Sequence, residues 1–140
     1  MKEHTLDSQI DKPLAVKLGI KAGSLIVALN PPSDYVETLK KSVAGLLVLQ
    51  EPRGAVDLIH IFTKEKTELE DKLPMMKRYL SQNGALWVSW PKRESGLGGD
   101  LKERDVREIG LKNGLVDVKV CAIDETWSGL KFVRRLRNRS

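Results

Sequence analysis

Four largely apolar segments constrain the fold of this chain more than any other feature. They occupy residues 24–29, 44–49, 56–62 and 85–90 and are rich in leucine, isoleucine and valine. A strand with helices on both faces buries both sets of alternating side chains, so such runs favour a parallel sheet. A helical stripe at Leu69, Leu73, Met76 and Leu80 lies between the last two runs. The alternation predicts an α/β protein built from right-handed β-α-β units.

Residues that favour helix ends mark the expected boundaries. Gly19 is expected to end the first helix, residues 83–84 to end the third, and Pro74 to kink the third. Asp100 is expected to form a capping box with Glu103. Helix starts are predicted at residue types that suit a cap or first turn: Pro13, Ser33, Thr67 and Asp100. An earlier start of the third helix, before Thr67, stays open.

The last two predicted strands alternate instead of running apolar. Val116, Val118, Val120 and Ala122 are expected to share one face, and Leu130 and Phe132 share a face after a short turn at 124–128. Alternation across a short connection is typical of an antiparallel hairpin. The predicted fold is therefore a Rossmann-like three-layer sandwich, with a mostly parallel sheet of about six strands and a C-terminal antiparallel hairpin.

Length and composition fit one small globular unit. We expect a flexible segment at 1–11, a single α/β domain at 12–136 and a basic tail at 137–140, since domains commonly span 100–150 residues. Cys121 is the single cysteine, which excludes an intramolecular disulfide and favours a reducing compartment. No signal-peptide pattern or membrane-spanning run is evident, so a cytoplasmic location is expected, without membrane partners.

The net charge of +5 is concentrated at the C-terminal end. Such a cluster can attract phosphates, but no aromatic residue interleaves with the final arginines to stack on bases. We therefore favour a solvated tail over nucleic-acid binding, and expect a small molecule or a protein as partner. The cluster comprises Lys131, Arg134, Arg135, Arg137 and Arg139.

Two segments carry a resemblance to the class I S-adenosylmethionine (SAM)-dependent methyltransferase fold. The helix-glycine-strand step at 83–92 resembles a late step of that fold, and the strands at 115–123 and 128–135 are similar to its antiparallel closing pair. The chain looks shortened beside that family. The segments Pro13-Leu14…Leu18-Gly19-Ile20, Ala85-Leu86-Trp87-Val88…Trp90-Pro91-Lys92 and Asp124-Glu125-Thr126-Trp127-Ser128 also resemble shared blocks of a family of short bacterial proteins known as a domain of unknown function.

The methyltransferase resemblance implies a site beyond the carboxyl ends of the strands, where open α/β sheets bind ligands. That family places glycines after its first strand, where this chain has Asn30-Pro31-Pro32, and prolines remove donor N–H groups. Glu51 matches the family's acidic residue that accepts hydrogen bonds from a ribose. We predict the cofactor-binding candidates at these strand ends to be Asn30, Glu51, Thr63 and Lys92.

Other motifs have ordinary interpretations. No set of histidine, cysteine and acidic residues has metal-ligand spacing, and His60 is expected to be a core or edge histidine. Lys92 with Ser95 is interpreted as a solvated lysine and a turn serine, and residues 96–99 as a flexible connector. The turn at 124–128 is interpreted as structural, although a ligand site there stays open, as does the edge of the sheet it reaches.

The favoured function is therefore an uncharacterised methyltransferase-like domain that is non-catalytic, uses no cofactor, and binds a small ligand or a protein. One alternative is a small SAM-dependent methyltransferase with an atypical cofactor loop. A second alternative is a nucleic-acid-associated protein that uses its basic C-terminus.

Overall fold

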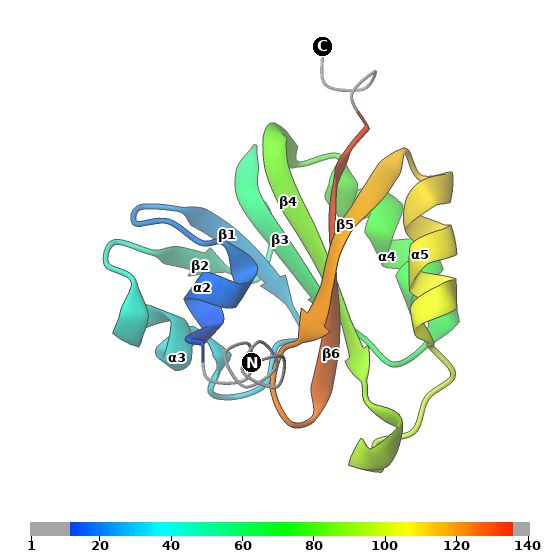
Figure 1. Cartoon of the computed structure of the whole chain (residues 1–140). Coiled ribbons are helices and arrows are strands. Elements are labelled where there is room, and N and C mark those ends of the chain that lie inside the picture. Colours follow the sequence, from blue (N-terminus) through cyan, green and yellow to red (C-terminus); the bar gives the residue numbers. More distant parts are fainter. Residues whose placement is uncertain (1–11, 136–140) are drawn as a thin grey trace, which may run out of the picture.

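The computed structural model describes residues 12–135, which form one six-stranded sheet with helices on either side (Figure 1). The expected segments at 1–11 and 137–140, with Arg137 and Arg139, lie outside the described residues. The strands are β1 (Leu25–Leu29), β2 (Leu47–Leu49), β3 (Val56–Phe62), β4 (Leu80–Pro91), β5 (Leu115–Ala122) and β6 (Trp127–Arg134). The helices are α2 (Leu14–Leu18), α3 (Tyr35–Ser42), α4 (Lys66–Lys77), the 3₁₀ helix η1 (Arg93–Ser95) and α5 (Glu103–Lys112).

The strand order is β2-β1-β3-β4-β6-β5. The first four strands in this order pair in parallel, whereas β6 runs antiparallel to both β4 and β5. The predicted mostly parallel sheet with a C-terminal antiparallel hairpin is confirmed.

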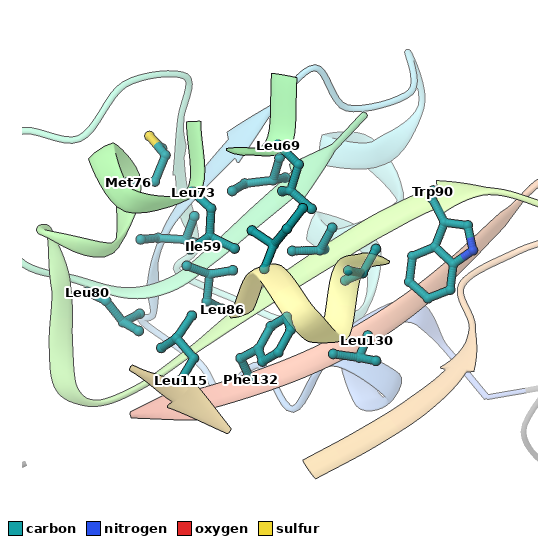
Figure 2. Close-up of a cluster of buried hydrophobic side chains, with 14 of the residues drawn as sticks. Ile59, Leu69, Leu73, Met76, Leu80, Leu86, Trp90, Leu115, Leu130 and Phe132 are labelled. Carbon is teal, nitrogen blue, oxygen red and sulfur yellow. The ribbon is translucent and has the colours of Figure 1, made fainter. Parts of the chain in front are cut away.

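The sheet separates two apolar clusters. The strands are apolar on both faces because each face packs against one of these clusters. Figure 2 shows the cluster beneath α4 and α5, where Leu69, Leu73 and Met76 of α4 pack toward Ile59 and Leu86 of the sheet. On the opposite face, α2 and α3 cover a second cluster. Its members include Ala15, Leu18, Leu39, Leu58 and Trp87.

The predicted boundary between α4 and β4 is wrong. Leu80 does not extend the helical stripe: α4 ends at Lys77, and Leu80 is the first residue of β4, paired with Val56. Residues 83–84 lie inside the strand, where the pairing of β3 with β4 shifts register and β4 carries the extra residues. A Cβ on Gly84 would lie 2.8 Å from the Asp57 carbonyl oxygen, so this glycine permits close approach of two strands instead of ending a helix.

Two predicted caps are also misplaced. Asp34, not Ser33, precedes α3. The start of α4 at Lys66 is the earlier start that the sequence leaves open beside the capping box at Thr67. The Asp100 carboxylate accepts from the Lys66 N–H at 2.8 Å, so it caps the neighbouring helix α4 instead of its own. The first helix is as predicted: Pro13 precedes α2, and Gly19 ends it in the left-handed conformation with φ 77°.

The predicted face of β5 is wrong as well. Val118 and Val120 are 53% and 43% exposed, whereas Leu115 and Cys121 are buried. A register shift between Asp117 and Lys119 reverses the alternation, and β5 is an edge strand of the sheet.

Candidate functional site

A cavity of about 680 Å³ opens at the carboxyl edge of the sheet. Its walls come from segments that are distant in sequence: α2 with the residues before it, the turn after β1, the first turns of α3, and the β5–β6 hairpin. Lining residues include apolar groups and charged groups of both signs: Leu14, Pro32, Phe62 and Ile123, with Tyr35 and Thr38, the lysines Lys17 and Lys92, and the acids Asp34, Asp124 and Glu125. The mixture of apolar surface with a few polar groups is typical of small-molecule sites.

The β5–β6 turn reaches this edge because β6 pairs antiparallel with β4. Trp127 pairs with Pro91, and the Lys92 N–H donates to the Thr126 carbonyl at 2.8 Å. The Asp124 carboxylate accepts from the Thr126 and Trp127 N–H groups, both at 2.8 Å, and so closes the turn. The turn therefore lies at the carboxyl edge (Figure 1). Its aspartate bonds the turn backbone, and Asp124 and Glu125 also line the cavity.

Lys17 joins α2 to the hairpin at the cavity wall. The residue is 5% exposed, and its Nζ donates to the Ile123 carbonyl at 3.2 Å. Lys119 Nζ in turn donates to the Lys17 carbonyl, also at 3.2 Å. A largely buried ammonium therefore borders the cavity, with a neutral carbonyl as its hydrogen-bond partner within residues 12–135.

A buried polar chain leads inward from the cavity wall. The Tyr35 hydroxyl lies 2.9 Å from His60 Nδ1, and His60 Nε2 lies 2.8 Å from Ser89 Oγ. Burial lowers the pKa of His60 to about 3 and raises the pKa of Tyr35, so both groups are neutral near pH 7. His60 also stacks on Phe62, with ring centroids 4.1 Å apart. The prediction of a core histidine is confirmed.

The sequence reasoning missed Tyr35 and Ser89 as partners of His60. A signal for Ser89 is present in the strand register, since His60 pairs with Trp87 and Ser89 lies two residues further along the same face. The sequence offers no comparable signal for Tyr35, because its approach to His60 depends on how α3 packs on the sheet.

Of the four predicted cofactor-binding residues, Asn30 and Thr63 are brought together by Glu68 of α4. Asn30 Nδ2 donates to the Phe62 carbonyl and to Glu68 Oε2, both at 3.4 Å, and the Thr63 hydroxyl donates to Glu68 Oε1. Asn30 has φ 57°, a left-handed conformation that asparagine tolerates. These two residues do not line the cavity.

The other two predicted residues lie apart from this group. Lys92 lines the cavity and also a second hollow of about 350 Å³ with Trp90, on the α5 side. Glu51 is exposed in the bend after β2 and does not line the cavity. The structure therefore distributes the four residues over three places along the carboxyl edge.

The glycine-rich connector is attached to the end of β3. The Lys64 carbonyl accepts from the N–H groups of Asp100 and Leu101, and Lys64 Nζ donates to the Leu97 carbonyl. A Cβ on Gly99 would lie 2.3 Å from the Lys64 carbonyl oxygen, so only glycine allows this approach.

The arginines at the end of β6 have structural partners. Arg134 donates to the carbonyls of Lys77 and Leu80 at 2.9 and 2.7 Å, and Arg135 donates to the Leu111 carbonyl at 2.8 Å. Two of these carbonyls end α4 and α5, where positive charge is favourable. Within residues 12–135, no cluster of three potential metal ligands and no helix able to cross a bilayer are found.

Comparison with known proteins assigns the family. The family model described as "Protein of unknown function (DUF3052)" matches residues 15–136. The chain belongs to this family. The predicted family of unknown function with a methyltransferase-like fold is confirmed, and no curated protein matches the chain.

Solved methyltransferases share the fold. The chain is similar to magnesium protoporphyrin IX methyltransferase from Synechocystis PCC 6803 with bound SAM, at 13% identity and a TM-score of 0.65, covering 96% of this chain and 80% of that one. It is also similar to a SAM-dependent methyltransferase from Aquifex aeolicus, at 17% identity and a TM-score of 0.58, covering 94% and 96%. At these identities the likeness shows the methyltransferase-like fold alone.

Proposed function

We propose that this chain binds a small organic molecule in the cavity against Tyr35 and Phe62, and that it transfers no methyl group from SAM. The cavity itself carries the proposal. Its volume of about 680 Å³ lies within the range of roughly 300–1,000 Å³ that is usual for small-molecule sites. Its position at the carboxyl edge is the position at which open α/β sheets bind ligands.

The turn after β1 supports the proposal that the ligand is a molecule other than SAM. Asn30 directs its amide to the Phe62 carbonyl and Glu68, and the next two residues are prolines without N–H groups. Pro32 forms part of the cavity wall, so its ring occupies space beside the turn. A ligand in this cavity therefore meets side chains of α2, α3 and the hairpin instead of a glycine backbone.

A second candidate function is that of a small SAM-dependent methyltransferase. Solved proteins with the same fold include one with bound SAM, and Asn30, Glu51, Thr63 and Lys92 lie at the edge where the fold would hold it. In this alternative Glu51 accepts hydrogen bonds from the ribose. The binding of SAM in solution separates the two candidates.

The test is a titration followed by amide NMR, with SAM, S-adenosylhomocysteine and a library of small organic fragments. We expect fragments to shift resonances of Leu14, Phe62 and Ile123, and SAM to leave Asn30 and Glu51 unchanged at millimolar concentration. Fragments that bind only elsewhere would contradict the proposal, and SAM-dependent shifts at Asn30 and Glu51 would establish the methyltransferase alternative.

A variant pair confirms the location. Thr38→Trp places an indole in the cavity and should abolish the fragment shifts, whereas Lys40→Trp adds the same indole at an exposed position of the same helix and should preserve them. Comparable unfolding midpoints of the two variants would show that both fold. Equal fragment binding by both would place the site outside the cavity.

A further inference from the structure

The direction of the hydrogen bonds in the Tyr35–His60–Ser89 chain determines which hydroxyl can donate a hydrogen bond to a group in the cavity. Both ring nitrogens of His60 have a hydroxyl within hydrogen-bond distance, at 2.9 Å for Tyr35 and 2.8 Å for Ser89. A neutral imidazole carries one N–H, so it donates to one hydroxyl and accepts from the other. The chain therefore has two possible directions.

In the first direction, Tyr35 donates to Nδ1 and the Nε2–H donates to Ser89. The Ser89 hydroxyl proton then needs a further acceptor. Ser89 is completely buried, and His60 is the one side-chain hydrogen-bond partner recorded for its hydroxyl within residues 12–135. This direction leaves a buried donor without a partner, which is costly in a protein interior.

In the second direction, Ser89 donates to Nε2 and the Nδ1–H donates to the Tyr35 oxygen. The hydroxyl proton of Ser89 and the Nδ1–H of His60 then both have acceptors. The one proton that has no acceptor within the chain is that of the Tyr35 hydroxyl. Tyr35 lines the cavity, whereas His60 and Ser89 do not. Tyr35 is 2% exposed and Ser89 0%, so of the two hydroxyls the one on the cavity-lining residue has the nearer access to an outside acceptor.

We propose that His60 is the Nδ1–H tautomer and that the Tyr35 hydroxyl donates a hydrogen bond to the ligand, which presents a carbonyl or carboxylate oxygen. The role of Tyr35 rests on the ligand-binding function proposed above, whereas the tautomer does not. Lys17 adds a second donor to the same wall, and its charge is compensated by no carboxylate within 4.0 Å among the described residues. An oxygen acceptor thus matches both groups. Asp34, Asp124 and Glu125 also line the cavity and would favour a cation, and the comparison with benzylammonium below tests which set of groups decides the ligand class.

The tautomer is tested on the free protein, by long-range ¹⁵N–¹H NMR of the His60 ring near pH 7. We expect a protonated Nδ1 and an unprotonated Nε2. A protonated Nε2 would overturn the inference and would leave the proposed binding function standing, which keeps the two failures distinguishable.

The ligand class is tested with three probes of similar shape: benzoate, benzamide and benzylammonium. We expect the first two to bind in the cavity and benzylammonium, which has no acceptor, to bind at least about tenfold more weakly; Tyr35→Phe should weaken benzamide about tenfold. Tighter binding of benzoate than of benzamide would assign a carboxylate, and equal binding a neutral carbonyl. Equal binding of benzylammonium, or no binding of any probe at millimolar concentration, would overturn the ligand assignment.

Discussion

Lowering the pH from 7 to 5 should destabilise the folded protein, because His60 is buried in its neutral form. Burial lowers the pKa of His60 from 6.5 to about 3, so between these values the unfolded chain binds a proton that the folded chain does not. Above pH 6.5 the histidine is neutral in both states, so it does not lower the free energy of unfolding. Below pH 6.5 the free energy of unfolding falls by about 1.4 kcal/mol per pH unit. The loss at pH 5 is therefore about 2 kcal/mol.

Urea unfolding at several pH values from 7 to 5, at constant ionic strength, measures this loss. The series ends near pH 5 because carboxylates begin to titrate below it. His60→Gln removes the buried imidazole and should flatten the slope. An unfolding free energy of wild type that stays constant from pH 7 to pH 5 would refute the reasoning that His60 stays neutral in the interior.

Three substitutions test contacts that hold α4 and α5 on the sheet. Gly110→Ala places a Cβ 2.1 Å from a ring carbon of Phe132 and should cost about 1–3 kcal/mol of unfolding free energy in urea, despite better helix propensity. Arg134→Met removes donors to two backbone carbonyls and should cost about 1–3 kcal/mol by the same measurement. Asp100→Ala removes the acceptor of the Lys66 N–H and should cost about 0.5–2 kcal/mol in thermal unfolding.

Each substitution has a control at an exposed residue. Glu108→Ala introduces an alanine at an exposed position of the same helix, Arg104→Met removes an exposed guanidinium, and Glu94→Ala removes an exposed carboxylate of η1. Each test variant should lose more stability than its control. An equal loss of stability in both members of a pair would contradict the role assigned to that contact.

The sheet was predictable because its signal is long and repeated. The apolar runs at 24–29 and 56–62 coincide with β1 and β3, and the run at 85–90 forms the second half of β4, so burial of both faces and parallel pairing follow from the pattern there. The run at 44–49 forms only the three-residue strand β2, whose Leu47 is exposed. The boundaries depended on partners distant in sequence. Leu80 has helical spacing, yet pairing with Val56 places it in β4, and Asp100 has the chemistry of a cap but serves the helix across the loop. Local pattern contains no information on either partner.

The edge that holds the cavity was predictable from topology, whereas its walls were not. Lys92 follows a strand end and lines the cavity, as the position of that strand suggested. Lys17 precedes the first strand, and the hairpin approaches it only because β6 pairs with β4. The residues that form the cavity are thus assembled by the packing of α2 and the hairpin, which the periodicity of the sequence does not specify.

A crystal structure of the protein grown with millimolar SAM and benzoate together tests the central claim most directly. The account predicts benzoate density in the cavity, with an oxygen within hydrogen-bond distance of the Tyr35 hydroxyl, and none for cofactor over residues 30–32. Cofactor density on that turn, with its ribose at Glu51, would contradict the account.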